Sequence, residues 1–408
     1  MAQCQITVNQ ELLHQLFLSN NKDAGMAALM ESVLNQILQA QATEQLQAEP
    51  YERTMERKGY RNGSYPHQLT TRVGTITLRV PRFRNGQFST EMFGRYQRSE
   101  QALVLALMEM VVNGVSTRKI SQITEDLCGS EFSKSTVSDL CKKLDPLVQA
   151  WNNRDLRDMS YPFVLVDALV LKIREEGRVR SRSAMIAIGI NTEGYREVLG
   201  LTLGGSESEA SWSEFFSWLK SRNLRGVDLI VSDDHKGLVK AVRQNFQGVS
   251  WQRCQTHFMR NILDTAPKSA AKELYPHLRA ILDAPDIDTA RLLLNQTLEI
   301  FEKRAPKAMQ TLEEGFDDAT AVLVLPEKYR RRLRTTNGVE RLNEEIRRRE
   351  RVIRIFPNRK SAIRLIGSLL MEIDDKWAAG KKYLDMDDYL QWQKEQKQCR
   401  IHLPLNTV

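Results

Sequence analysis

Cysteine is scarce in this chain of 408 residues, and the few cysteines follow no pairing pattern. They are odd in number and widely spaced: Cys4, Cys128, Cys141, Cys254 and Cys399. Small secreted domains held together by disulfides carry an even and closely spaced set, so a framework of that kind is excluded. We therefore expect a protein of a reducing compartment.

Long hydrophobic runs are also missing. The longest apolar segments, FVLVDALVL and AVLVLP, have the length of strands, well short of the roughly 18 residues that cross a bilayer. The first residues, MAQCQITVNQELLHQLF, contain no basic stretch followed by an apolar core, which is the pattern of a signal peptide. These absences predict a cytoplasmic protein with no membrane partner.

Glycine and proline are too few for a fibrous or low-complexity chain. There are 21 glycines and 12 prolines, while 41% of the residues are hydrophobic and 27% charged. This composition is typical of a globular protein, and the length predicts two or three domains.

Basic charge is present in excess, and it is concentrated in one segment. The chain carries a net charge of +8, whereas residues 328–364 alone contain 14 basic and four acidic residues, a net charge of +10. A solvated helix face explains part of this excess. A surface that binds phosphates explains its position better, and Arg347, Arg348 and Arg349 are our candidates for contacts with DNA.

The first third of the chain predicts helices and a basic hairpin. Residues 8–48 have helical periodicity, 51–66 are typical of a loop, and 67–88 alternate like two short strands with a basic face that includes Arg82 and Arg84. Three helical segments follow. The second and third predict a helix-turn-helix with Arg118, Lys119 and Lys134 exposed to DNA and Ser133 or Ser135 as N-cap, although an ordinary packing hairpin fits nearly as well.

Residues 161–257 change to strand periodicity. Three consecutive strand-like runs, separated by turns at Gly177 and Gly194, predict an antiparallel meander. A helix, a strand, a helix and a short strand follow, so the predicted order is βββαβαβ, which is that of a ribonuclease H-like fold. Residues 258–325 show almost only helical spacing and predict an all-α insertion. Trp212, Trp218 and Trp251 are expected in the core.

Three acidic residues stand out by their positions. Asp167 lies inside an apolar strand, where an unpaired carboxylate is unfavourable without a cation or donors, although a solvent-facing Asp is the simpler alternative. Asp233 ends a buried strand, but it or Asp234 could merely cap the next helix. Glu340 fits a capping box that begins at Asn337, and it shares a helix face with Asn343.

Three carboxylates that converge on one point repel one another unless a cation compensates. Mg²⁺ and Mn²⁺ prefer oxygen ligands, and two such ions about 4 Å apart suit in-line phosphoryl displacement. Asp167, Asp233 and Glu340 lie on the first strand, at the end of the fourth, and on the helix after the insertion. We therefore expect these three to be the catalytic and metal-binding residues, and Mg²⁺ or Mn²⁺, as two ions, to be the cofactor.

Several segments of the chain resemble the Mutator-like family of bacterial insertion-sequence transposases. They are FVLVDAL, VSDDHKGL, WQRCQTHFMRN and TTNGVERLNEEIRRR, with ERKGYRNG, TTRVGTITLRVPRFRNGQF and GVSTRKI before them. The resemblance covers residues 50–375, and Asp167, Asp233 and Glu340 match the three acidic positions of the family. It implies a DDE transposase that cleaves DNA at terminal inverted repeats and transfers the strand into target DNA.

The resemblance also includes the C-x-x-H pair of Cys254 and His257. Half of a zinc site is one alternative, but no second pair of suitable spacing is present. We expect Cys254, His257, Asn337 and Asn343 to have structural roles near the acidic site.

The combined prediction is an α/β protein whose ribonuclease H-like core is interrupted by an all-α insertion and preceded by a mainly helical DNA-binding region. Its partners are expected to be double-stranded DNA and further copies of the chain, at a bacterial nucleoid. A non-catalytic DNA-binding regulator remains the alternative. The expected domains are an N-terminal DNA-binding segment (1–95), a helix-turn-helix-like region (96–155), the first part of the core (156–258), the insertion (259–330), the final basic helices of the core (331–376) and a C-terminal tail (377–408).

Overall fold

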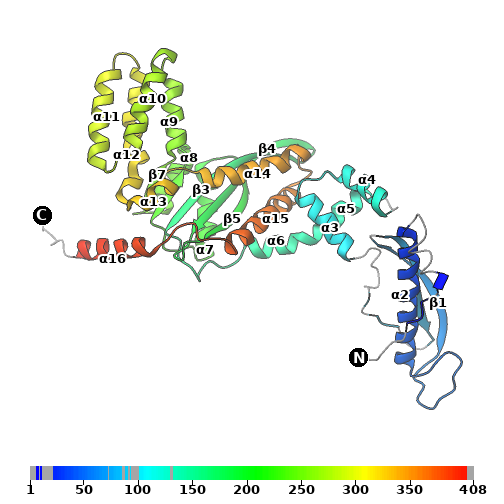
Figure 1. Ribbon diagram of the computed structural model, residues 1–408. Coiled ribbons are helices and arrows are strands. Elements are labelled where there is room, and N and C mark those ends of the chain that lie inside the picture. The colour runs from blue at the N-terminus through cyan, green and yellow to red at the C-terminus, as the bar shows by residue number, and fades with distance from the viewer. Residues whose placement is uncertain are drawn as a thin grey trace. The chain divides into compact units, whose positions relative to one another are not determined.

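The computed structural model describes residues 22–71, 73–84, 88–90, 92, 101–128 and 132–401, together with 6–8 and 10–11. The chain divides into two compact units, Met1–Lys143 and Leu144–Val408 (Figure 1). Helices occur in both units and a mixed sheet in the second, so the predicted α/β class is confirmed.

The first unit begins with a helix packed on a hairpin. Helix α2 spans Lys22–Leu46, and strands β1 (Arg61–Thr71) and β2 (Gly74–Phe83) pair antiparallel. Apolar side chains of all three elements form a small core: Leu38, Leu69, Ile76, Leu78 and Val80. The predicted hairpin is present. The predicted helix over 8–48 is observed from Lys22 onward, and residues 12–21 lie outside the described part.

Three helices complete this unit, namely α3 (Gln101–Val112), α4 (Thr117–Cys128) and α5 (Lys134–Cys141). Gly114 follows α3 with a φ of +84°, a conformation that favours glycine and ends the helix. Ser133 is the N-cap of α5, since its hydroxyl accepts a hydrogen bond from the Thr136 amide at 3.1 Å. The prediction of a serine cap at this position is therefore confirmed.

A five-stranded sheet organises the second unit, in the order β5-β4-β3-β6-β7. Its strands are β3 (Phe163–Glu175), β4 (Arg178–Ile190), β5 (Arg196–Gly204), β6 (Leu229–Ser232) and β7 (Ser250–Arg253). The first three form the predicted antiparallel meander, whose turns contain Gly177 and Gly194 with φ of +75° and +91°. Strands β6 and β7 join parallel to β3.

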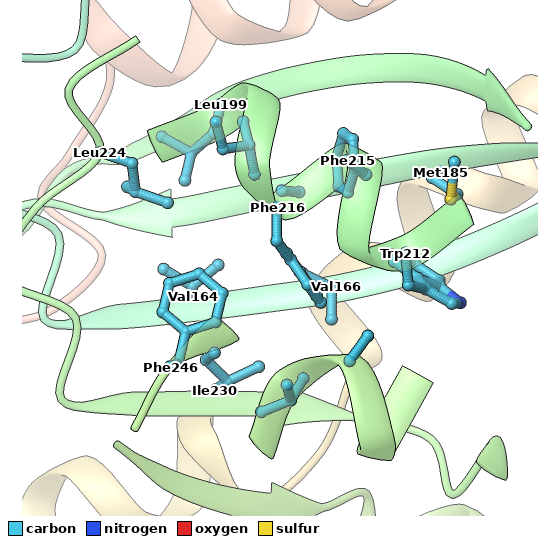
Figure 2. Packing of buried hydrophobic residues seen from close by; sticks show 14 of the residues in the cluster. Val164, Val166, Met185, Leu199, Trp212, Phe215, Phe216, Leu224, Ile230 and Phe246 are labelled. Atoms are coloured by element: carbon cyan, nitrogen blue, oxygen red, sulfur yellow. The ribbon is translucent and has the colours of Figure 1, made fainter. Parts of the chain in front are cut away.

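Helices α7 (Glu209–Ser221) and α8 (Lys236–Asn245) cover one face of this sheet. Figure 2 shows the core between these helices and the sheet, where Val164 and Val166 of β3 contact Trp212 and Phe216 of α7. Trp212 and Trp251 are buried and Trp218 packs against the same core, so the expectation for the three tryptophans is confirmed.

The rest of the described second unit is helical. Four helices after β7 enclose a core of their own, as predicted for the insertion (Figure 1). They are α9 (Gln255–Thr265), α10 (Lys268–Leu282), α11 (Ile287–Phe301) and α12 (Pro306–Thr320). The other helices of the unit are α6 (Asp145–Asn152), α13 (Glu327–Leu333), α14 (Asn337–Ile353), α15 (Arg359–Ala378) and α16 (Asp387–Ile401).

Helix α14 lies beside β3, and α15 lies beside β5 and α6. Helix α16 falls within the segment expected to be a C-terminal tail, and its Tyr389 is fully buried against Phe163 of β3.

In the described part of the chain, no helix is both long and apolar enough to cross a membrane.

Candidate active site where one strand ends beside its parallel neighbour

Strand register places Asp167 and Asp233 side by side. The pairing of β3 with β6 matches Leu165 with Val231, so the two aspartates, each two residues further, occupy neighbouring positions where β6 ends. Strands in a sheet lie roughly 4.8 Å apart, which keeps both carboxylates within Coulomb range.

Asp167 points to the sheet face that α14 covers. One carboxylate oxygen accepts a hydrogen bond from the Ala168 amide at 2.8 Å, and the other accepts one from Asn343 Nδ2 at 2.6 Å. Burial, together with the negative charge of Asp233, raises the pKa of Asp167 to about 7. The carboxyl group is therefore held in a place that favours a neutral group or a neighbouring cation.

His257, on α9, lies between the other two acidic residues. Its Nδ1 is 2.5 Å from Oδ1 of Asp233, and its Nε2 is 3.6 Å from Oε1 of Glu340. Interactions with Asp233 and then Cys254 raise the pKa of His257 to about 10, against the opposing effect of burial. The imidazolium thus supplies positive charge to this group of carboxylates.

Cys254 is buried at the start of α9 and joins this helix to α14. Its sulfur accepts hydrogen bonds from the amide and the hydroxyl of Thr336, at 3.4 and 3.3 Å. Burial raises the pKa of the thiol, but hydrogen bonds from His257 and Thr336 outweigh it and lower the pKa overall. Ligand atoms of Asp233, Cys254 and His257 all lie within 4.8 Å of one another.

The predicted capping box at Asn337 is wrong. Helix α14 already begins at Asn337, and Thr336 precedes it without a side-chain cap. The reason is that the Thr336 amide and hydroxyl both bond to Cys254, which fixes the start of the helix one residue earlier. Asn343 contacts Asp167 directly, whereas Asn337 is exposed and its role near the site stays a prediction.

A fourth carboxylate, which the sequence did not single out, belongs to the same neighbourhood. Glu207 lies in the loop between β5 and α7, and its charge contributes to the raised pKa of Asp167. Burial raises the pKa of Glu207 itself, and His235 Nδ1 lies 3.7 Å from its Oε1. The signal that could have identified it is an acidic residue in the short loop after β5, three positions beyond Gly204.

The residues predicted to contact DNA are exposed, with one exception. Arg82, Arg84, Arg118, Lys119 and Lys134 lie on the surface of the first unit. Arg347 and Arg348 are exposed on α14, with Glu350 and Glu345 as respective partners. The side chain of Arg349 is only 5% exposed and paired with Glu345, so the structure contradicts its prediction as a DNA contact.

One carboxylate within a strand, a second directly after the neighbouring parallel strand, a third on a facing helix and arginines further along that helix are features of an enzyme that acts on the phosphodiester bonds of nucleic acid. The chain belongs to the Mutator family of transposases, because the model described as "Transposase, Mutator family" matches residues 1–380. The predicted membership of this family is thereby confirmed. It makes the chain a transposase, an enzyme of DNA cleavage and strand transfer.

Three named transposases are similar in sequence to this chain over most of its length. The transposase for insertion sequence element IS256 in transposon Tn4001 of Staphylococcus aureus is 46% identical over 390 residues, which cover 95% of this chain and 100% of that protein. The transposase for ISRM5 of Rhizobium meliloti is 43% identical over 92% of this chain and 94% of its own length. The transposase for IS1081 of Mycobacterium tuberculosis is 36% identical, over 89% and 88% respectively.

Proposed function

We propose that the chain is a DDE transposase whose catalytic residues are Asp167, Asp233 and Glu340, held by a ribonuclease H-like core. The observation that carries this proposal is the neighbouring placement of Asp167 and Asp233 on parallel strands, with Glu340 linked to Asp233 through His257. The sheet order β5-β4-β3-β6-β7, with an antiparallel meander before two parallel strands, supports the assignment of the fold.

The donors of the site fit hard divalent cations. Carboxylate oxygens are the ligands that Mg²⁺ and Mn²⁺ prefer, and the raised pKa of Asp167 indicates negative charge that lacks compensation. We propose that Asp167, Asp233 and Glu340 hold two such ions. When bound, these would supply Lewis acidity to the attacking oxygen and to the leaving oxygen of a phosphodiester.

Neighbouring residues orient the acidic groups. Asn343 donates to Asp167 and fixes its rotamer, while the imidazolium of His257 holds Asp233 and faces Glu340. Cys254 anchors the start of α14, and with it the position of Glu340 in the first turn of that helix. We assign Cys254 and His257 structural roles, because His257 Nδ1 lies 2.5 Å from Asp233 and the Cys254 sulfur accepts hydrogen bonds from Thr336.

We propose that the first unit recognises the terminal inverted repeats. The relatives are named as transposases of insertion sequence elements, and such ends must be located in duplex DNA. The basic hairpin (within 1–95) and the α4–α5 pair (within 96–155) expose the cations for this contact: Arg82, Arg84, Arg118, Lys119 and Lys134. Residues 156–258 and 331–376 would form the catalytic core around the insertion 259–330, and synapsis of two ends at the bacterial nucleoid would need at least two copies.

Cleavage of element ends tests the catalytic assignment. With Mg²⁺ or Mn²⁺ and a duplex that carries the cognate ends, the protein should nick at those ends. Asp167→Asn, Asp233→Asn and Glu340→Gln should each reduce nicking by about a thousandfold or more while DNA binding persists, since each removes one charged ligand.

The matched control is Asp234→Asn. Asp234 is adjacent to Asp233, but its carboxylate lies 3.0 Å from Nη1 of Arg253, so this variant should retain nicking. Unchanged nicking in any of the three site variants would remove that residue from the proposed set. Specific binding without nicking under every metal condition would instead favour a DNA-binding regulator.

A further inference from the structure

The hairpin formed by β3 and β4 extends beyond the helices that cover its face. Alternate residues of β3 face α7 and α8 as far as Ala168, with Val166 fully buried and Ala168 partly buried against the same core. On the same face further along, Val170 is 51% exposed, and Val179 opposite Arg174 is 48% exposed. The distal half of the hairpin therefore presents an uncovered surface.

The tip of this hairpin is basic on both faces: Lys172 and Arg174 lie on the uncovered face, and Arg178, opposite Glu175, lies on the other. Lys172, Arg174 and Arg178 are exposed near the hairpin turn, and within the described residues their side chains make neither an ion pair nor a hydrogen bond. Of the acidic residues nearby, Glu175 pairs with Arg182 and Glu176 with Arg180. Glu350 pairs with Arg347 and also attracts Lys172 and Arg351 at longer range.

The end of α14 adds to the same surface. Phe356 forms a parallel bridge with Ile173, in which its amide donates to the Lys172 carbonyl at 2.8 Å and its carbonyl accepts from the Arg174 amide at 2.9 Å. This bridge holds Arg351 and Arg354 next to the edge of β3, where both are exposed and, among the described residues, neither forms a close ion pair.

Arg354 also occupies an unusual position. It directly follows α14 with a φ of +61°, in the region that favours glycine and that other residues adopt with strain. A cation at a position better suited to glycine indicates a use for its charge.

We propose that this surface, which we call the hairpin-tip surface (Lys172, Arg174, Arg178, Arg351 and Arg354), binds the phosphate backbone of the substrate duplex to one side of the cleavage point. Five exposed cations, of which none forms a close ion pair within the described residues, match a polyanion and oppose the approach of a second copy through the same basic patch. Arg174 lies seven residues along β3 from Asp167, about 23 Å, which corresponds to about seven base pairs of duplex. The odd spacing turns the two side chains to opposite faces of the strand, so we place the contact at the edge of the hairpin, beside Arg351 and Arg354. The proposal rests on the proposed active site only for this distance.

Salt dependence of binding tests the contact with phosphates. The triple variant Lys172→Gln, Arg174→Gln and Arg178→Gln is compared with the full-length protein on a duplex of unrelated sequence, in EDTA, over a range of NaCl concentrations. Loss of three phosphate contacts should lower the slope of log Kobs against log salt by about 2 to 3, and weaken binding to any sequence. Arg351→Gln with Arg354→Gln should lower it by about 2.

The matched control removes the same charge elsewhere. Lys268 and Lys272 on α10, and Lys303 after α11, are exposed and, in the described chain, unpaired. Their triple glutamine variant should leave the slope within about 1 of the unmodified protein. An unchanged slope in the hairpin variants, or an equal loss in this control, would refute the proposal. A change in self-association without a change in slope would show that the surface contacts another copy, which also overturns it.

Cross-linking tests the position of the duplex. A photoreactive phenylalanine at Val179 should attach to DNA about seven base pairs from the nicking position on a duplex that carries an element end. Attachment at random positions would refute the placement beside the site. Failure of the active-site proposal would instead appear as nicking by the Asp167→Asn variant, with the salt slopes unaffected, so the two outcomes are distinguishable.

Discussion

Two consecutive aspartates at the end of β6 have different partners. Asp233 pairs with His257, whereas Asp234 pairs with Arg253, whose side chain is 9% exposed. The sequence left the choice between them open, because both follow the same buried strand. The pairings favour Asp233 as the residue of the site and give Asp234 a structural partner.

Because the pKa of Asp167 is raised, replacing its carboxyl group with a neutral amide should stabilise the folded protein, by an amount that depends on pH. In the folded state the pKa is about 7 against an ordinary 3.8, so charging the carboxyl between these values destabilises the native protein. In EDTA, Asp167→Asn should unfold at higher denaturant than the unmodified protein above pH 7, by up to about 4 kcal/mol. The difference should shrink as the pH falls through 7 and vanish below about 4.

Divalent cations provide the control for this effect. Mg²⁺ or Mn²⁺ should stabilise the unmodified protein and not Asp167→Asn, so the difference should decrease or reverse at pH 8. A difference that stays constant with pH would mean that the carboxyl is not perturbed by folding.

At the scale of elements, the start of α8 is pressed against the start of α7. An added Cβ at Gly237 would lie 2.7 Å from the Glu209 amide nitrogen and 2.9 Å from the Ser208 carbonyl carbon. Both are backbone atoms, which cannot move aside without shifting the loop that carries Glu207. This close approach is what brings that loop next to the segment containing Asp233.

Gly237→Ala should therefore destabilise the protein by about 1–3 kcal/mol and slow nicking, because the clash separates the two segments. Denaturant unfolding and the nicking assay measure the two effects. Gly338→Ala is the matched control in the first turn of α14, where the nearest atom to the new Cβ, Leu165 Cδ2, is 4.0 Å away. It should be neutral or stabilising by up to about 1 kcal/mol; equal loss in both variants would refute the packing argument.

At the scale of the whole molecule, the second unit contains two hydrophobic cores of its own. The sheet core draws on residues 156–251 and the insertion core on residues 258–323, so both lie within Leu144–Val408. A fragment of residues 144–408 should fold alone, with a cooperative thermal transition by circular dichroism. It should keep salt-dependent binding to any duplex but lose preference for element ends. An unfolded or aggregated fragment would contradict this division.

Element order and the acidic positions of the site were predictable from local signals. Turns at Gly177 and Gly194 separate alternating apolar runs, and this pattern predicted the meander. Asp167 was conspicuous because a carboxylate inside an apolar strand is unfavourable without a partner. The proximity of Glu207 was not predictable, since it depends on how two helix starts pack and no periodicity encodes that.

The charged residues show the same contrast between what the sequence determines and what the tertiary structure determines. The sequence by itself determined that the basic excess lies in residues 328–364, and that Asp167, Asp233 and Glu340 occupy separate elements. Only the tertiary structure decided which charges are free, because burial and pairing depend on residues distant in sequence. It buried Arg349 beside Glu345, gave Asp234 to Arg253 and left Lys172 and Arg174 exposed and unpaired within the described chain. Strand register likewise brought together carboxylates that the sequence separates by 66 positions.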